Sequence, residues 1–416
     1  MNIAKTDSQV SQKFSGEWEM KQLQDISDIN PQNLSSNTNP NYKFNYISLE
    51  QVDSGRLLGY FEEIFRTAPS RAQRVLRNGD VLMSTVRPNL MAHLFFHDQV
   101  PNAVCSTGFA VLRAKHNLSD PYFLFSQLFT QGVNDQITKI LAGSNYPAIN
   151  SHDVKLIEIP CPPQIFEQRA IAEALSDVDG LLNALEALIA KKRVIKQAVM
   201  QQLLTGRTRL PGFSGEWETK RLGEIAPIRN HKTLPAYVNP DTLCVELDHI
   251  EQRSGQLLEY AIARNSTSSK YHFCAGDVLF GRLRPYLRKF WHADQDGICT
   301  TEIWPLMVNK DQIDSGFLYG IVQSDPFIGA ASISYGTHMP RADWNVIRNF
   351  EISLPEIQEQ RAIASVLFDI EAEIAALEQR RDKTRAIKQG MMQQLLTGRV
   401  RLSESRICTD LSDDAD

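Results

Sequence analysis

The stretch PPQIFEQRAIAEALSDVDGLLNALEALIAKKRVIKQAVMQQLLTGRTRL, residues 162–210, decides the fold of this chain. It opens on Pro162 and Pro163, contains no further proline, and is followed at once by Pro211. A single long helix that begins and ends at prolines has this form. Apolar residues recur along the stretch at alternating spacings of four and three, which is the a/d seam of a coiled coil. The seam positions are Ile171, Leu175, Val178, Leu182, Leu185 and Ile189.

The stretch returns at residues 354–402 as LPEIQEQRAIASVLFDIEAEIAALEQRRDKTRAIKQGMMQQLLTGRVRL. The two connectors agree in length and frame, as two helices that pair with each other require. The alternative is a pair of ordinary amphipathic helices, each packed on its own domain. At about 1.5 Å per residue, about 40 helical residues form a rod of roughly 60 Å, nearly two turns of duplex DNA. The second seam consists of Ile363, Leu367, Ile370, Ile374 and Leu377.

The segments before each connector are also repeated. FSGEW at 14–18 returns at 213–217, and GDVLMSTVRPNL from Gly79 returns as GDVLFGRLRPYL from Gly276. SGRLLGY at 54–60 likewise returns as SGQLLEY at 254–260. A period of about 200 residues is too long for a solenoid and indicates tandem duplication of a whole domain. We expect Trp18 and Trp217 to anchor the core against the helix base rather than to stack on DNA.

The repeated framework encloses segments that have diverged. Residues 91–142 match residues 288–335 poorly, although the flanking motifs agree. One architecture that presents two different recognition surfaces has this pattern, because the framework fixes geometry while loops carry specificity. A symmetric dimer would read a palindrome, whereas one chain with two diverged copies can read two different half-sites.

We therefore predict two tandem α/β (α+β) globular domains separated by long antiparallel coiled-coil helices with a pseudo-two-fold internal repeat. FNYISLEQV and GDVLMSTV, with their counterparts TLCVELDHI and GDVLFGRL, have the character of strands. PYFLFSQLFT and SGFLYGIVQS have the character of short helices. The predicted boundaries are a first recognition domain at 1–160, a helical connector at 161–210, a second recognition domain at 211–354, a second connector at 355–402 and an acidic, disordered tail at 403–416.

Composition places the chain among ordinary globular proteins, with 42% hydrophobic and 22% charged residues. The polar N-terminus has no apolar signal region, so we expect a cytoplasmic protein. The six cysteines form no CxxC pair, which argues against a zinc knuckle or a disulfide framework. The formal net charge is −5, but residues 403–416 hold five acids against Arg406, which leaves about −1 for the rest. A nucleic-acid role must therefore rest on local basic patches.

A search for catalytic or metal motifs yields none that carries chemistry. The chain has no GxG and no GK dipeptide, which excludes a Rossmann fingerprint and a Walker loop. NPNY at 39–42 follows a polar run instead of an apolar strand, and it lacks the second proline of the related methyltransferase motif. His93 and His97, and likewise His272 and Cys274, lie in apolar surroundings without a third ligand at a recognisable spacing. We assign no catalytic residue and no metal site.

Basic residues and polar loops carry the argument for DNA binding. Arginine can bind phosphates or the O6 and N7 atoms of guanine. The alternative is a solvated surface or a framework salt bridge, which weighs most for Arg87 and Arg284 because they lie in the repeated framework. The loops GSNYPAINSH and GTHMPRADWN occupy equivalent places before the connectors. The candidate DNA-binding residues are Arg87, Ser144, Asn145, Tyr146, Arg282, Arg284, Arg288, Lys289, Thr337, His338 and Arg341.

The distal part of the first connector is also basic. Lys191, Lys192, Arg193 and Lys196, followed by Arg207 and Arg209, have no acid among them. Such a run is usually a solvated helix face. It could equally meet an acidic patch on a partner protein or DNA phosphates.

The order of these motifs resembles the specificity subunit of type I restriction-modification systems. The order is FSGEW, a diverged domain, EQRAIA at the start of a heptad helix, and QQLLTGR. The same order then occurs a second time, and the two copies cover nearly the entire chain. The resemblance implies a non-catalytic subunit whose two domains each read one half of an asymmetric, bipartite DNA site. It implies that the helices set the spacer and dock two methyltransferase (modification) subunits, to which restriction (motor-nuclease) subunits are added. It further implies that S-adenosylmethionine, ATP and Mg are used by the partners, with no cofactor bound by this chain.

Two other interpretations remain open. The chain could serve a related system whose partner fuses nuclease and methyltransferase, and only the partner's sequence separates that case. It could instead be a coiled-coil scaffold without sequence reading, which would show no salt-sensitive, sequence-selective DNA binding.

Overall fold

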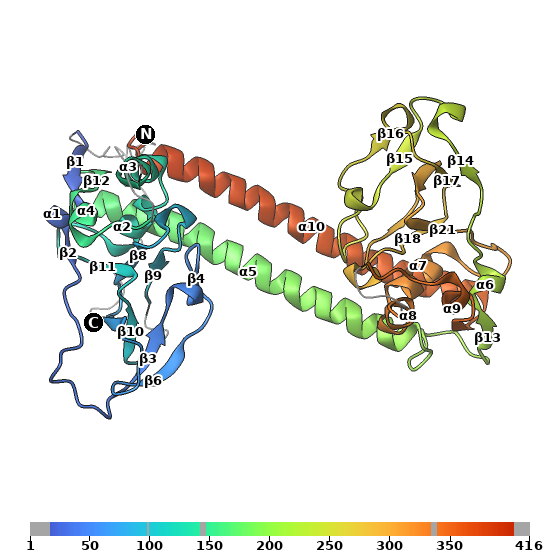
Figure 1. The fold of residues 1–416 in the computed structure, drawn as a ribbon, viewed down its shortest axis with the longest axis horizontal. Coiled ribbons are helices and arrows are strands. Elements are labelled where there is room, and N and C mark those ends of the chain that lie inside the picture. Colours follow the sequence, from blue (N-terminus) through green and yellow to red (C-terminus); the bar gives the residue numbers. More distant parts are fainter. Residues whose placement is uncertain (1–16, 98–99, 142–146, 334–338, 403–416) are drawn as a thin grey trace, which may run out of the picture. The chain divides into compact units, whose positions relative to one another are not determined.

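The computed structural model describes residues 17–97, 100–141, 147–333 and 339–402. The chain divides into two compact units. Unit 1 consists of Met1–Ala184 and Arg381–Asp416, and unit 2 consists of Leu185–Arg380. The two long helices, α5 (Ile165–Leu203) and α10 (Ile357–Leu395), each pass from one unit into the other (Figure 1). Each unit therefore contains a globular part, the start of one connector and the end of the other.

Unit 1 is built from short strands and small helices. One sheet has the order β6-β3-β10-β7, and a second has the order β2-β11-β8-β9. Strand β10 pairs in parallel with β3, whereas the second sheet is antiparallel throughout. The strands of unit 1 are β1 (Glu19–Gln22), β2 (Ser27–Ile29), β3 (Lys43–Ile47), β4 (Val52–Asp53), β5 (Arg56–Leu57), β6 (Phe61–Ile64), β7 (Ala72–Val75), β8 (Val81–Ser84), β9 (Leu94–Phe95), β10 (Ala103–Ser106), β11 (Phe109–Ala114) and β12 (Glu158–Cys161). Its helices are α1 (Leu23–Ile26), η1 (Leu49–Gln51), η2 (Pro88–Leu90), α2 (Pro121–Gln127), α3 (Gln131–Leu141) and α4 (Ser151–Leu156).

Unit 2 repeats this plan. A sheet of order β14-β17-β20-β15-β16 and a sheet of order β19-β18-β21 correspond to the two sheets of unit 1. Its strands are β13 (Glu218–Arg221), β14 (Lys232–Thr233), β15 (Leu243–Val245), β16 (Ala261–Ile262), β17 (Lys270–Phe273), β18 (Val278–Gly281), β19 (Phe290–His292), β20 (Gly297–Thr300), β21 (Ile303–Leu306) and β22 (Glu351–Leu354). Its helices are α6 (Leu222–Ile225), η3 (Pro235–Tyr237), η4 (Leu247–His249), η5 (Ala263–Asn265), η6 (Pro285–Leu287), α7 (Ser315–Gln323), α8 (Asp325–Ala331) and α9 (Trp344–Ile347).

The predicted architecture is confirmed. Both long helices form within the predicted connectors, and the expected short helices form as α2 and α7. GDVLMSTV and GDVLFGRL contain the buried strands β8 and β18. The acidic tail at 403–416 lies outside the described residues. Among the described helices, none is long and apolar enough to cross a membrane.

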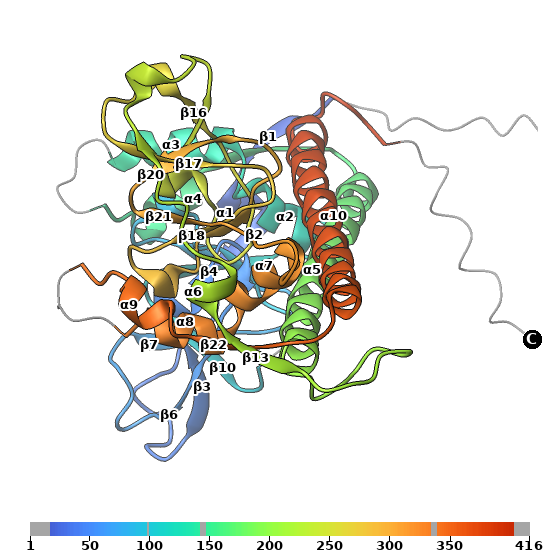
Figure 2. The same cartoon turned by 90° about the vertical axis from the view of Figure 1, so that its right-hand side faces the viewer.

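The predicted seam of the helices is buried. Along α5 every seam residue is buried except Val178, which is half-buried, and along α10 only Ile370 and Leu377 are half-buried. In unit 1 the seam joins the end of α10 and the helices α2 and α3 in one apolar core. In unit 2 the seam joins the end of α5 with α7 and α8 in one apolar core, and Figure 2 shows α7 beside the long helices. The globular part of each unit thus covers the end of a helix that started in the other repeat.

The helices run antiparallel in each unit and are joined by equivalent ion pairs. In unit 1 the Lys388 ammonium lies 2.6 Å from the Asp179 carboxylate. In unit 2 the Lys196 ammonium lies 2.6 Å from the Glu371 carboxylate. Lys388 lies 192 residues after Lys196, and Glu371 lies 192 residues after Asp179, so the two ion pairs are equivalent and the two helix pairs share one register. Lys192 and Arg193 add pairs with Glu373 and Glu378 in unit 2.

A buried carboxylate in each EQR motif binds an arginine from the other repeat. Glu167 accepts hydrogen bonds from Nε and Nη2 of Arg401, at 2.8 and 2.5 Å. Glu359 accepts the same two bonds from Arg209, at 2.6 Å each. The two glutamate side chains are 0% and 2% exposed. We call each of these bidentate pairs a clasp.

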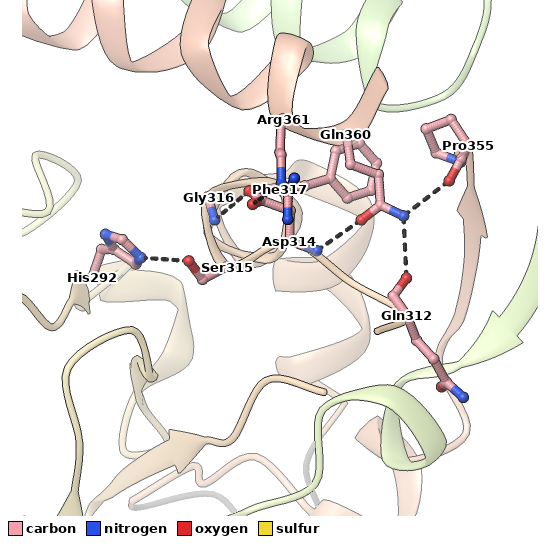
Figure 3. Close-up of polar contacts among 9 residues, drawn as sticks. All are labelled: His292, Gln312, Asp314, Ser315, Gly316, Phe317, Pro355, Gln360 and Arg361. Carbon is pink, nitrogen blue, oxygen red and sulfur yellow. Dashed lines mark hydrogen bonds and ion pairs between the residues drawn. The ribbon is translucent and has the colours of Figure 1, made fainter. Parts of the chain in front are cut away.

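The glutamine of the EQR motif secures the start of each long helix. In unit 2 the Gln360 amide oxygen accepts from the Asp314 backbone N–H at 2.9 Å (Figure 3). Its amide nitrogen donates to the carbonyls of Gln312 and Pro355, at 3.2 and 2.9 Å. The Asp314 carboxylate in turn caps α7 by accepting from the N–H groups of its first turn. One side chain thereby ties α10 to the capped end of α7.

Unit 1 uses the same joint with its own residues. Gln168 accepts from the Asp120 backbone N–H at 3.0 Å and donates to the Leu118 carbonyl at 3.2 Å. Asp120 caps α2 as Asp314 caps α7. Each copy of the EQR motif therefore makes two separate contacts. Its glutamate forms a clasp, and its glutamine ties the long helix to a capped helix of the same unit.

The repeated tryptophans pack on glycines of the TGR motifs, as the core-anchor interpretation predicted. Trp217 lies against Gly206, where an added Cβ would come within 3.3 Å of the indole. Trp18 lies against Gly398, where the corresponding distance is 2.9 Å. Both glycines have positive φ, +68° and +70°, a conformation that other residues rarely adopt. FSGEW and TGR are thus the two halves of one contact, and each half comes from a different repeat.

The clasps yield the first prediction. Glu167→Gln is expected to reduce the free energy of unfolding by about 1.5–3 kcal/mol, because hydrogen bonds to charged groups contribute about that much. In a double-mutant cycle measured by urea unfolding, Glu167→Gln and Arg401→Gln should be coupled. Glu173→Gln, an exposed change on the same helix, should alter stability by less than about 0.5 kcal/mol.

The cycle also tests which repeat supplies the arginine. Glu167→Gln combined with Arg209→Gln should be additive within about 0.5 kcal/mol, although these residues lie only 42 positions apart. Coupling of Glu167 to Arg209 in place of Arg401 would contradict the exchange of connector ends between the repeats.

Candidate nucleic-acid interface

The turn after β8, and its counterpart after β18, present an exposed arginine on a strained backbone. Arg87 and Arg284 have φ of 49° and 51°, in the left-handed region that non-glycine residues seldom adopt. Each precedes a proline that opens a single 3-10 turn, η2 or η6. Such strain persists only where the surrounding structure enforces it and is often associated with function. The backbone at these two positions is held in the same way in both units.

The loop that precedes α4 or α9 supplies the partner strand. In unit 1 the Arg87 N–H donates to the Pro147 carbonyl at 2.7 Å, and the Ile149 N–H donates to the Thr85 carbonyl at 2.9 Å. In unit 2 the same two bonds join Arg284 to Pro340 and Ala342 to Arg282, at 2.8 Å each. Two loops that the sequence separately suggested as DNA-facing are therefore adjacent in both units.

A third loop, the connection from one sheet to the other between β10 and β11 or between β20 and β21, closes the arrangement. The Thr85 N–H donates to the Gly108 carbonyl, and the Arg282 N–H donates to the Glu302 carbonyl, at 2.8 Å in both cases. Sequence reasoning missed this loop. Its only signal is a short match between CST at 105–107 and CTT at 299–301, which is too brief to notice in isolation. We call the three loops together the tripartite edge of each unit.

Arg87 and Arg284 are exposed, and within the described part of the chain neither guanidinium has a hydrogen-bond or ion-pair partner. A framework salt bridge, the alternative that weighed most for these two residues, is therefore not seen there. The two arginines occupy equivalent positions and are held by equivalent backbone contacts in the two units.

The other basic candidates are engaged within unit 2. Arg288 donates to the Gln323 carbonyl at 3.2 Å and pairs with Asp325, and this bond lowers the pKa of the Asp325 carboxyl. Lys289 donates to the Leu247 carbonyl at 2.6 Å. These two side chains stabilise the fold in the first instance.

Arg282 and Arg341 lie at the tripartite edge of unit 2 beside a single acid. The Arg282 guanidinium lies 5.4 Å from the ring centroid of Trp304. Arg341 donates to both carboxylate oxygens of Glu302, at 3.1 and 3.0 Å, and this hydrogen bond raises the pKa of Arg341. The side chains of Arg341 and Glu302 are 39% and 29% exposed, so solvent reaches this ion pair. An outside partner could therefore replace Glu302 at Arg341.

The remaining candidates lie outside the described residues. Ser144, Asn145 and Tyr146 precede the described part of the loop in unit 1. Thr337 and His338 precede it in unit 2.

The histidines considered as metal ligands have structural surroundings. His93 is buried behind the turn of unit 1, where its Nδ1 accepts from the Ser84 N–H at 3.1 Å, and burial lowers its pKa to about 4. His97 stacks on Phe95, and His272 stacks on His231 with centroids 4.5 Å apart. In the described residues no three histidine, cysteine or acidic side chains gather as metal ligands.

A family model described as "Type I restriction modification DNA specificity domain" matches the chain twice, at residues 15–197 and 214–385. The MjaVIII specificity subunit of Methanocaldococcus jannaschii is 23% identical over 321 residues, which cover 72% of this chain and 75% of that protein. The putative MjaX specificity subunit of the same organism is 23% identical over 93% of this chain and 94% of its own length. The EcoDI specificity subunit of Escherichia coli is 25% identical over 55% of this chain and 58% of its own length.

Two solved structures share the fold. A chain from a study of complex assembly and conformational transition in a type I R-M system has a TM-score of 0.58 at 22% identity, covering 94% of this chain and 100% of its own length. The S subunit of the type I system of M. genitalium has a TM-score of 0.53 at 15% identity, covering 94% of this chain and 98% of its own length. At these identities the likeness concerns the fold alone.

Proposed function

We propose that the two units of this chain recognise different parts of one DNA site. The chain belongs to the type I restriction modification DNA specificity family. The chain is a DNA-recognition subunit, and its family implies DNA and the other subunits of the restriction-modification complex as partners. Members of this family are generally non-catalytic. Our proposal is that unit 1 and unit 2 each read one half of an asymmetric, bipartite site, and that the chemistry resides entirely in the partners.

The observation that carries the proposal is the tripartite edge, which is built twice on one backbone plan with different side chains. Thr85 in unit 1 corresponds to Arg282 in unit 2, and Gly108 corresponds to Glu302. Ala148 and Arg341 also correspond, since each forms the β-bridge to the turn. Base edges are distinguished by the donors and acceptors of side chains, so these differences would give the two units different sequence preferences.

Arg87 and Arg284 are the constant feature of the two edges. A contact that both units make regardless of sequence suits the phosphate backbone, which positions a protein without specifying bases. Ser144, Asn145 and Tyr146, with Thr337 and His338, continue the same loops and are proposed to take part in reading.

The long helices are proposed to set the spacer and to dock the modification subunits. Each helix runs for 39 residues, which at about 1.5 Å per residue corresponds to roughly 58 Å. We propose two methyltransferase (modification) subunits per chain, joined by restriction (motor-nuclease) subunits. These partners would use S-adenosylmethionine, ATP and Mg in the cytoplasm, while this chain would bind none of them.

Two alternatives make different predictions. A related system with a fused nuclease-methyltransferase partner would give the same split recognition, and the partner's sequence identifies it. A scaffold without sequence reading would show no difference in affinity between DNA sequences at any salt concentration.

Exchange of one reader is the direct test of modular reading. Replacing residues 27–160 by those of a relative should change one half of the methylated motif and leave the other half and the gap unchanged. Methylated positions mapped across a genome after co-expression with the modification subunit provide the readout. A change in both halves would show that the units do not read independently.

Removal of the constant arginines should weaken DNA binding without altering preference. Arg87→Ala and Arg284→Ala should each reduce affinity for all sequences and lower the slope of log affinity against log salt by about 1, because one phosphate contact is lost. Arg341→Ala should instead change the preference of one half-site. Arg221→Ala, an exposed change on the separate β13–β22 sheet, is the matched control and should leave the salt slope unchanged.

Shortening one helix tests the spacer. Deletion of seven residues, one heptad, from the middle of a single connector should shift the gap in the methylated motif or prevent assembly, because the buried seam and the ion pairs fix the antiparallel register of the two helices. An unchanged gap with full activity would exclude a role of the helices in spacing.

A further inference from the structure

Each unit displays an exposed leucine and an exposed tyrosine in the segment that follows a short hairpin. In unit 1 the hairpin is formed by β4 and β5, and the Leu58 N–H donates to the Gln51 carbonyl at 2.7 Å. In unit 2 the Leu258 N–H donates to the His249 carbonyl at 2.8 Å. Leu58 and Leu258 are 64% and 62% exposed. Tyr60 and Tyr260 are 45% and 61% exposed.

These side chains do not serve the cores of the units. Leu57 and Leu257, one position earlier, pack against the core of their respective units. Because successive side chains of an extended segment point to opposite sides, Leu58 and Leu258 point outward. Two large apolar side chains per unit therefore remain exposed to water, so they contribute no hydrophobic stabilisation to the fold.

The two units agree at these exposed positions although the neighbouring exposed positions differ. Arg56 corresponds to Gln256, and Phe61 corresponds to Ala261. Single exposed apolar residues are common and need no explanation. The same leucine and tyrosine are exposed in both copies of this repeated segment, so an occupant that binds one unit through them can bind the other unit in the same way.

The charge around the hairpins argues for a protein occupant over DNA. Residues 50–60 contain two acids and one arginine, and the equivalent residues 248–260 contain three acids and one arginine. Glu50 and Asp248, at equivalent places in η1 and η4, are both exposed. The Asp248 carboxylate lies 3.9 Å from the Lys289 ammonium. An acidic rim repels phosphates and suits a basic partner.

We propose that the Leu58–Tyr60 and Leu258–Tyr260 patches are a second docking surface for the modification subunits, one subunit on each unit. The inference rests on the proposed function, because it takes from there a partner present in two copies. The partner surface is expected to be apolar at its centre and basic at its rim. Contact at the hairpin would fix each modification subunit against the unit whose half-site it modifies.

The test measures binding of the modification subunit to the full chain. Leu58→Ser with Tyr60→Ser should weaken binding of one of the two modification subunits at least tenfold, so that the complex isolated by size-exclusion chromatography shifts from two such subunits per chain toward one. Leu258→Ser with Tyr260→Ser should do the same through unit 2. Glu50→Lys with Asp248→Lys should weaken both sites, most strongly at low salt.

Matched controls separate docking from surface polarity and folding. Met20 is 58% exposed in unit 1 and corresponds to Thr219 in unit 2, so Met20→Ser removes an exposed apolar group that the repeat does not share. It should leave the stoichiometry unchanged. Thermal unfolding of the free chain should be the same for all variants.

Two outcomes would overturn the inference. Unchanged binding of both modification subunits would exclude docking at the hairpins. Weaker, salt-dependent DNA binding with intact stoichiometry would assign the patches to DNA instead. The methylated motif of the wild-type complex tests the proposed function separately. If that motif is split, the two units still read two half-sites, even when the patches do not bind the modification subunits.

Discussion

The buried carboxylates of Glu167 and Glu359 impose the constraint on which the rest of the structure depends. A carboxylate removed from water must be paired, and each of these is paired with an arginine from the other repeat. The clasps therefore require that each connector end in the unit whose globular part comes from the other repeat. The ion pairs between the helices and the tryptophan–glycine contacts follow the same exchange. The glutamine joints, in contrast, form within one repeat and fix the start of each helix to its own globular part. Duplication of a domain together with its connector thus produces two units that cannot be assigned to one repeat each.

This exchange gives the repeated motifs separate meanings. EQR supplies a buried acid and an anchoring amide, TGR supplies a glycine with positive φ, and FSGEW supplies the indole that packs on it. None of these residues lies at the tripartite edges, where the two units differ. Constant residues therefore build the units, and the edges remain free to vary without disturbing the clasps. Arg87 and Arg284 are the exception, since they are constant and yet exposed, which is the reason for their proposed contact with phosphates.

The sequence allows prediction of whatever depends on local pattern. Pro163 and the four–three spacing of apolar residues place the start and the body of α5 correctly, and the Gly-Asp turns place β8 and β18. The predicted end at Pro211 is wrong, because the helix stops at Leu203 before Gly206, which has positive φ. The partner of each helix end could not be derived in this way, because a 3.5-residue period indicates a seam without indicating which helix fills it. Arg288 and Arg341 resemble free surface charges in the sequence, yet Asp325 and Glu302 reach them from 37 and 39 residues away. Exposure of Arg87 and Arg284 depends on a left-handed backbone that no residue type in the motif signals.

Reading of two different half-sites by one chain is tested most directly by the methylation pattern of the wild-type complex. The chain would be co-expressed with its modification subunit in an unmethylated host, and modified adenines would be mapped across the genome by long-read sequencing. We predict a split motif with two different halves and a fixed, unspecified gap. A palindromic or continuous motif, or no new methylation despite a stable purified complex, would contradict the account.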